Sequence, residues 1–215
     1  ADIASTLGLV ASPHPAAITV ATILQRLSAF SVGNIVVSIF EPASERGNNA
    51  VEELRQQTIN IFSFQQIPKT VFDSQLAFNL LSQLGEDAKE PLISSERVIA
   101  SHVRALLRPG SPLPSMALIQ APVFHSHAFS FFVEIDVKVP LTDLEKCLES
   151  DTISVTATDD EPPSPVEMAG NDGIRIGGMK RDVINPRGLW FWATSDNLRL
   201  AAGNAVAAAE QCLLH

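Results

Sequence analysis

Two histidines separated by one residue are the side chains of this sequence best suited to acid–base chemistry. His125 and His127 stand just before a long segment rich in phenylalanine and valine. Histidine titrates near neutral pH and can therefore accept or donate a proton in catalysis. Their alternation around Ser126 predicts that both point to one side of a strand, where a metal pair is conceivable but no third ligand is in view. A single histidine at the start of a strand is more often structural, so both interpretations of His127 stay open.

The cysteines do not lie in a pattern typical of a nucleophile, a metal site or a redox pair. Cys147 and Cys212 are the two cysteines of the chain, and both lie among apolar residues expected to be helical. Neither belongs to a CxxC motif or adjoins a histidine. We therefore expect two reduced, buried thiols in a cytoplasmic protein.

The composition predicts a folded protein and argues against nucleic acid and membrane partners. The 215 residues are 46% apolar and 18% charged, enough for one large domain or two small ones with a substantial core. The net charge is −9 without a basic stripe, which disfavours nucleic acid and anionic membranes. No apolar run reaches the roughly 18 residues of a membrane span, and no signal peptide is visible. The chain begins at Ala1 without Met, so we expect that a tag or an entire domain has been removed upstream.

The hydrophobic pattern predicts helices and strands that do not alternate strictly. Helices are expected over residues 13–30, 47–58, 94–107 and 197–214, and Thr142 with Glu145 predicts a capping box for one more. Strands are expected over residues 34–40, 115–123, 128–139, 153–158, 174–180 and 189–193. The segment 128–139 alternates, with one apolar face that runs from Phe129 to Val137. This pattern favours an α+β fold with a mixed or antiparallel sheet and helices packed on one face.

Four segments of the chain occur in an order typical of one enzyme family. They are residues 76–79 (LAFN), 121–127 (APVFHSH), 177–182 (GGMKRD) and 188–210, which contains SDNLR and NAV. These segments resemble PIAFN, RVPVFxGHS, GRIRRD and the final helix region of the aspartate-semialdehyde dehydrogenases. The resemblance implies that residues 1–215 form the semialdehyde dehydrogenase dimerisation domain, similar to the C-terminal domain of glyceraldehyde-3-phosphate and aspartate-semialdehyde dehydrogenases. The family's N-terminal Rossmann domain, which binds most of NADP, is absent from these 215 residues.

The resemblance also implies that most of the family's active-site positions carry other residues here. The family's nucleophile is a cysteine at a helix N-terminus, which lowers the thiol pKa; that position falls on Pro15, which has no nucleophilic atom. The family's substrate-positioning glutamine falls on Glu41. Its arginine for the substrate carboxylate falls on Gln120, which cannot form a bidentate charged pair. The family's acid/base histidine is kept, as His127.

Two further histidines lie close to family positions. His14 adjoins the replaced nucleophile, but an imidazole is not expected to form the thioester, and a polar residue in the first turn of a helix is its simplest role. The family's helix that supplies a glutamate and a lysine for substrate and phosphate carries His102 and Ala105 here.

The cofactor side of the family's site is altered as well. Asn197, with Asp196, matches residues that touch the nicotinamide end of NADP, although capping the final helix is a simpler role for this pair. Gly47 is the one loop glycine that remains, and the bulk and negative charge of Glu41 oppose a phosphorylated cofactor. We therefore expect no cofactor for this chain, although the family uses NADP.

Taken with the resemblance, the sequence favours a catalytically inactive relative of the aspartate-semialdehyde dehydrogenases. Its expected role is dimerisation, as a homodimer or with an active paralogue, or binding of a small acidic metabolite in the remnant cleft. The alternative is an NADP-dependent semialdehyde oxidoreductase of amino-acid biosynthesis, whose cofactor domain lies outside these residues and whose altered chemistry centres on His127.

Overall fold

One six-stranded mixed sheet organises the chain. The computed structural model describes residues 11–157 and 160–213, and its strand order is β2-β1-β3-β6-β5-β4. The strands are β1 (Val32–Glu41), β2 (Ser115–Gln120), β3 (His127–Ile135), β4 (Ile153–Val155), β5 (Ile174–Arg181) and β6 (Gly188–Ser195). The β1–β2 and β4–β5 pairs are parallel, and the other neighbours are antiparallel. The α+β architecture predicted from the sequence is confirmed.

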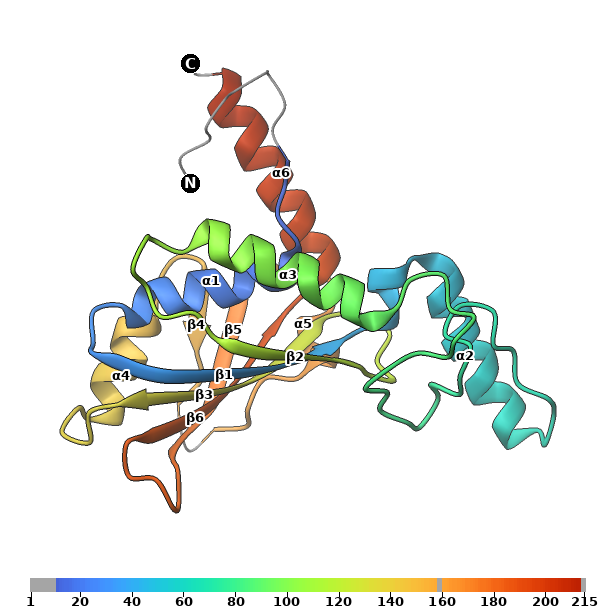
Figure 1. Ribbon diagram of the computed structural model, residues 1–215, viewed down its shortest axis with the longest axis horizontal. Coiled ribbons are helices and arrows are strands. Elements are labelled where there is room, and N and C mark those ends of the chain that lie inside the picture. The colour runs from blue at the N-terminus through green and yellow to red at the C-terminus, as the bar shows by residue number, and fades with distance from the viewer. Residues whose placement is uncertain (1–10, 158–159, 214–215) are drawn as a thin grey trace.

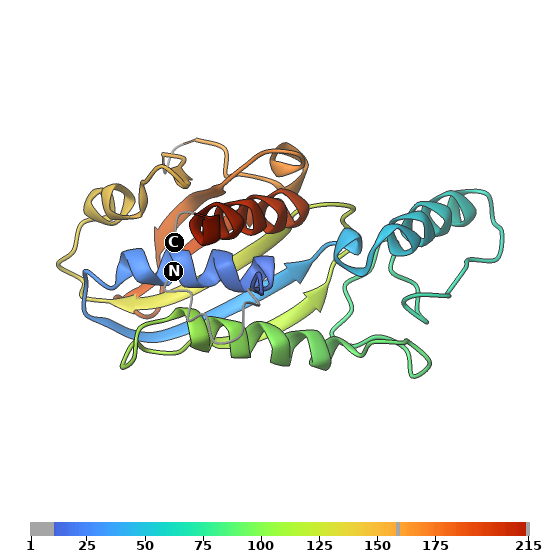
Figure 2. The same cartoon turned by 90° about the horizontal axis from the view of Figure 1, so that it is seen from above.

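Helices cover one side of this sheet (Figure 1). The long helices of the chain are α1 (Pro15–Leu27), α2 (Asn48–Phe62), α3 (Leu92–Leu106) and α6 (Asn197–Leu213), and the shorter ones are α4 (Leu141–Leu148), α5 (Pro165–Met168) and the 3-10 helix η1 (Ala43–Arg46). Helices α1 and α3 lie across the sheet, whereas α6 rises away from it (Figure 1). Helix α2 lies beyond the end of the sheet, as Figure 2 shows from above. None of the described helices is long and apolar enough to cross a membrane.

The core lies between the sheet and its covering helices. The side chains of Phe129, Phe131, Val133 and Ile135 point to the helices from β3 and are fully buried. The ring of Phe131 stacks on that of Phe191 in β6, with centroids 4.8 Å apart and planes 8° from parallel. The alternation predicted for this strand is therefore confirmed as far as Ile135.

The strand is shorter than the sequence predicts, because a turn begins at Asp136. The Asp136 carboxylate accepts a hydrogen bond from the Lys138 amide at 3.0 Å, and its carbonyl accepts one from Val139 at 3.1 Å. Aspartate favours such turns because its side chain bonds to the backbone two residues on. Val137, predicted to lie on the apolar face, is 51% exposed instead.

Two other local predictions are wrong. Helix α4 begins at Leu141 after Pro140, two residues earlier than a cap at Thr142 requires, so Thr142 lies inside the first turn. The capping box of the described chain is formed by Ser164 and Glu167 at the start of α5. The predicted burial of both thiols is also wrong: Cys212 is exposed on α6, which stands clear of the sheet, and Cys147 is partly exposed.

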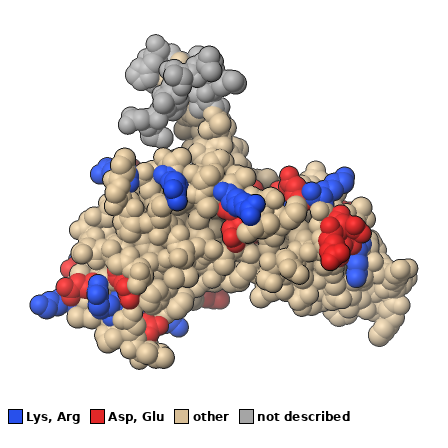
Figure 3. All heavy atoms as spheres, in the orientation of Figure 1, with Lys and Arg blue, Asp and Glu red and all other residues tan. Residues whose placement is uncertain are grey.

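The opposite side of the sheet carries no helix in the part of the chain described by the structure (Figure 1). We call it the open sheet face and define it by Val36, Phe40, Phe132, Trp190 and Trp192. The rings of Phe40 and Trp192 lie 5.6 Å apart, and those of Phe132 and Trp190 lie 5.1 Å apart. The open sheet face is thus largely apolar and aromatic. On the face of the molecule shown in Figure 3, by contrast, basic side chains are dispersed and form no continuous patch.

We expect Phe131→Ala to lower the free energy of unfolding by about 3–5 kcal/mol, because it removes a buried stacked ring and leaves a cavity. Phe64→Ala is the matched control, since the Phe64 side chain is 99% exposed. It should change stability by no more than about 0.5 kcal/mol. Denaturant unfolding of both variants tests this, and equal losses would contradict the proposed core.

Candidate functional site

The start of α1 presents a histidine and a proline to the end of the sheet. His14 is the N-cap residue, and its Nδ1 atom accepts a hydrogen bond from the Ala16 amide at 3.1 Å. The backbone amide of His14 donates to Nδ1 of His102 in α3 at 3.0 Å. Pro15 is buried at the first helical position, where a missing N–H costs no helix hydrogen bond. The predicted polar role of His14 in the first turn is confirmed.

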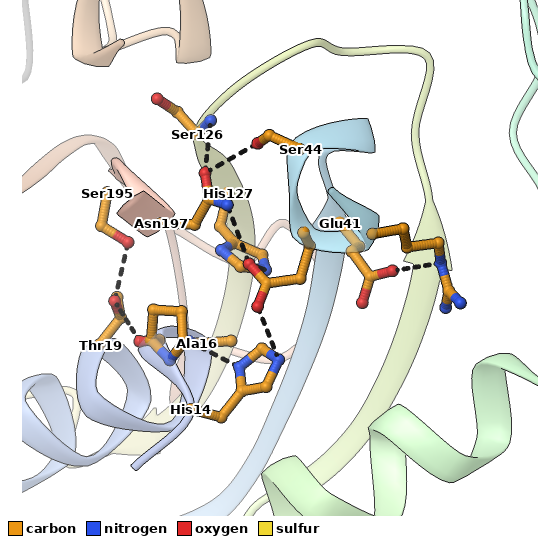
Figure 4. Close-up of polar contacts among 12 residues, drawn as sticks. His14, Ala16, Thr19, Glu41, Ser44, Ser126, His127, Ser195 and Asn197 are labelled. Atoms are coloured by element: carbon orange, nitrogen blue, oxygen red, sulfur yellow. Dashed lines mark hydrogen bonds and ion pairs between the residues drawn. The ribbon is translucent and has the colours of Figure 1, made fainter. Parts of the chain in front are cut away.

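Glu45 of η1 lies between two histidines that are far apart in the sequence. Its Oε1 atom is 3.2 Å from Nε2 of His14, and its Oε2 atom is 3.9 Å from Nε2 of His127 (Figure 4). The two imidazole rings meet edge to face, with centroids 5.9 Å apart. Since Nδ1 of His14 accepts a hydrogen bond, a neutral His14 carries its proton on Nε2, facing Glu45.

Asn197, the first residue of α6, holds Glu45 in this place. Its Nδ2 atom donates to Oε2 of Glu45 at 3.0 Å. Its Oδ1 atom accepts from the Ser44 hydroxyl at 3.1 Å and from the Ser126 amide at 3.3 Å. The preceding residue, Asp196, caps α6 by accepting from the Arg199 amide at 2.8 Å. The predicted capping role of this pair is confirmed for Asp196, whereas Asn197 ties η1 to the turn before β3.

A second cluster joins Glu41, Arg46 and Gln120. Nε of Arg46 lies 2.9 Å from Oε1 of Glu41, but its N–H donates to Oε1 of Gln120, also at 2.9 Å, so the contact with Glu41 is an ion pair without a hydrogen bond. The Gln120 amide donates in turn to the backbone carbonyl of Glu41 at 2.8 Å. Gln120 is therefore engaged in holding Arg46 and β1 rather than free for a ligand.

Burial sets the ionisation of this region. Burial, together with a smaller effect of a neighbouring histidine in each case, lowers the pKa of His127 to about 3 and that of His14 to about 4. Burial raises the pKa of Glu41 to about 7, against the opposing effect of Arg46. It also raises the pKa of Glu45, which the hydrogen bond from Asn197 offsets in part. The two histidines are consequently neutral at physiological pH.

His127 and His125 do not share a side of one strand. His127 is fully buried at the start of β3, and neither ring nitrogen has a hydrogen-bond partner. His125 is partly exposed in the preceding turn, where Ser126 adopts a left-handed φ of 71° and redirects the chain. The predicted common orientation of the pair is therefore wrong. Within residues 11–157 and 160–213, no three metal-ligating side chains form a cluster suited to a metal ion.

These residues border a cleft of about 280 Å³ between η1, α1 and α3. Its lining consists of His14, Glu41, Glu45, Arg46, Glu90, Ser94, Ser95 and Val98. Two hollows of about 610 Å³ each lie on the open sheet face and beside α2, away from both histidines. Sequence reasoning did not identify Arg46, Glu90 or the two serines, because no local motif marks them.

Gly47, the retained loop glycine, has a local explanation. It adopts φ 84° between η1 and α2, a left-handed conformation that glycine accepts without strain.

Comparison with known proteins agrees with this fold. The sequence profile of the family described as "Semialdehyde dehydrogenase, dimerisation domain" matches residues 24–200, and the chain belongs to this family. The matched region contains the positions of Glu41, Gln120, His127 and Asn197, and it begins after Pro15.

The similar proteins are aspartate-semialdehyde dehydrogenases. The chain is 29% identical over 211 residues to "Aspartate-semialdehyde dehydrogenase" of Rickettsia bellii, a match that covers 95% of this chain and 62% of the relative. It is 29% identical to a probable aspartate-semialdehyde dehydrogenase from Pseudomonas aeruginosa of known structure, with a TM-score of 0.87 and coverage of 99% of this chain and 65% of that one. Aspartate semialdehyde dehydrogenase II from Vibrio cholerae is 25% identical, with a TM-score of 0.82 and coverage of 94% and 61%. The chain thus spans less than two thirds of the length of these proteins.

The lowered histidine pKa values predict a loss of stability in acid. A histidine whose pKa is about 3 folded and 6.5 unfolded stabilises the fold fully above pH 6.5, and this contribution is lost as the pH falls below that value, because the unfolded chain binds the proton first. When the pH falls from 8 to 5.5, we expect the free energy of unfolding of His127→Phe to decrease by about 1 kcal/mol less than that of the wild type. The raised pKa of Glu41 has the opposite effect on stability as the pH falls, but this effect is present in both the wild type and His127→Phe. Urea unfolding at both pH values measures the difference, and equal losses would contradict the assignment.

Proposed function

We propose that this chain serves as a dimerisation module of an aspartate-semialdehyde dehydrogenase-like protein and lacks the thiolate chemistry of that family. The observation that supports the proposal is which residues fill the space where the family's reaction would take place. Pro15 stands at the helix start where the resemblance places the nucleophile, and the Glu45 carboxylate lies between His14 and His127.

The chemical reason concerns the two groups that the family's reaction needs, a nucleophile and a proton donor. A carbonyl substrate needs a thiolate on one side and a proton donor on the other. Pro15 provides no such atom, and the pKa of His127, lowered to about 3 by burial, leaves it a poor proton donor at neutral pH. Gln120, where the resemblance places the carboxylate-binding arginine, accepts a hydrogen bond from Arg46.

The open sheet face is the surface we propose for self-association. It presents Trp190 and Trp192 together with Val36, which is 43% exposed. The nearby loop adds Val183 and Ile184, which are 96% and 88% exposed. Large contiguous apolar surfaces of this kind mark protein interfaces, and a two-fold dimer would cover the same face on both copies. The same face would serve pairing with an active homologous chain.

The alternative proposal is an NADP-dependent semialdehyde oxidoreductase whose cofactor domain lies outside these residues. Two considerations favour it. The resemblance places the family's acid/base histidine at His127, and the relatives extend well beyond the part that this chain covers. This alternative requires chemistry without a thiol at residue 15.

We expect no NADPH above a no-protein control when the chain is incubated with NADP, aspartate semialdehyde and phosphate. Pro15→Cys should remain inactive, because Gln120 cannot bind the substrate carboxylate and Glu45 still separates the histidines. The variant should stay within about 1 kcal/mol of wild-type stability, since the first helical turn tolerates both residues. NADPH absorbance measures turnover, and a cysteine-containing aspartate-semialdehyde dehydrogenase is the positive control. Turnover by the wild type would favour the alternative instead.

We also expect a dimer in sedimentation equilibrium at micromolar concentration. Val36→Lys should shift the chain to monomer, because a two-fold interface places both introduced charges in the same apolar contact. Val206→Lys on α6, on the other side of the sheet, is the matched control for charge and should leave the dimer intact. A wild-type monomer, or equal dissociation by both variants, would refute this interface.

A further inference from the structure

We infer that in the homodimer the hairpin between β5 and β6 of one copy packs on the outer end of α2 of the other copy. This inference rests on the proposed function, because it names a contact at the edge of the proposed interface on the open sheet face. It begins from two exposed apolar groups of side chains. We call them the hairpin tip, formed by Val183 and Ile184, and the α2 patch, formed by Ile59, Phe62, Phe78 and Leu80.

The hairpin tip is a well-ordered loop that holds two aliphatic side chains in solvent. The Asp182 carboxylate accepts hydrogen bonds from the backbone amides of Ile184 at 2.8 Å and Asn185 at 2.7 Å. It also accepts one from Nε1 of Trp190 at 2.6 Å. These bonds fix the loop before a partner arrives, so little conformational entropy is lost when the tip is covered. The tip is therefore suited to insertion into an apolar surface.

The α2 patch is exposed and carries no charge. Its four side chains are between 42% and 72% exposed, and the rings of Phe62 and Phe78 meet edge to face with centroids 5.6 Å apart. Phe78 adopts a left-handed φ of 62°, a strained conformation that concentrates at functional segments when the residue is bulky. Neither residues 56–68 nor residues 74–85 contain Asp, Glu, Lys or Arg. Depletion of charge is typical of the centre of a protein interface.

Both groups lie on the side of the open sheet face, at opposite ends of the sheet. The hairpin precedes Gly188, which pairs with Glu134 near the end of β3, and that end of β3 lies beside the start of β1. Helix α2 follows the other end of β1 through η1. In Figure 1 the hairpin and the last turn of α2 both extend below the sheet, away from α1 and α3. The two groups therefore flank the open sheet face.

A two-fold axis in the interface can pair these groups in two ways. An axis perpendicular to the line between them places each hairpin tip against the partner's α2 patch, and the contact forms twice. An axis along that line places tip against tip and patch against patch. Lys180 and Arg187 flank the tip and are exposed. Against a second hairpin they would meet the same cations, whereas over the α2 patch they face aromatic rings, which attract cations. The charges thus favour the first arrangement.

Cross-linking between single-cysteine chains tests this pairing. Both chains carry Cys147→Ser and Cys212→Ser; one adds Val183→Cys, and the other, which has a tag that changes its size, adds Leu80→Cys. A short bismaleimide should join the two chains after they are mixed, and it should join neither chain to itself. Val206→Cys on α6, mixed with Leu80→Cys, is the matched control and should give no product.

Two results of this experiment would overturn the inference. The first is cross-linking of the Val183→Cys chain to itself or of the Leu80→Cys chain to itself, which indicates the other axis. The second is the absence of any product in a mixture that sediments as a dimer.

A charge exchange provides a second test. Val183→Asp and Phe62→Lys should each weaken the dimer at least about tenfold, because each places a charge in an apolar contact. A mixture of the two variants should regain wild-type affinity, since the opposite charges meet at one contact and the other contact is unchanged. Val206→Asp should leave the affinity unaltered. Wild-type affinity of both single variants, or no recovery on mixing, would refute the contact.

The inference and the proposed function fail separately. A wild-type monomer in sedimentation equilibrium would refute both. If Val36→Lys dissociates the dimer whereas Val183→Asp and Phe62→Lys do not, the interface on the open sheet face stands, and only the contact between the hairpin tip and the α2 patch is refuted. Circular dichroism confirms that each variant is folded, as expected for substitutions of exposed side chains.

Discussion

The buried amide of Asn197 is the constraint on which the site depends. It joins Ser44 and Glu45 of η1 to Ser126 before β3, across sequence separations of up to 153 residues. A buried side-chain amide must satisfy both its donor and acceptor groups, so these segments are held in one arrangement. Because Asn197 also begins α6, capped by Asp196, the direction of that helix is fixed by the same junction.

This junction determines what the neighbouring histidines can do. By fixing Glu45, it places a carboxylate in the space between His14 and His127. The surrounding burial disfavours every charged form, which lowers the pKa of both histidines and raises that of both glutamates. Burial thus keeps both histidines neutral and opposes the ionisation of Glu41 and Glu45, which supports the proposal that covalent chemistry has been lost.

The cleft and the open sheet face lie on opposite sides of the sheet. Alternate residues of β1 point to opposite sides, so Glu41 faces the helices and the cleft, whereas Val36 and Phe40 face the uncovered side. Association through one side therefore leaves the other accessible.

The sequence by itself determined the local features, because strand and helix periodicities are written in neighbouring residues. The alternation through Phe129–Phe131 and the cap at Asp196 could both be predicted. Tertiary structure decided the rest: that Glu45 lies between two histidines, that Arg46 pairs with Glu41 and that Cys212 is exposed. These relations join elements that no local pattern relates, and their distances follow only from how the helices pack on the sheet.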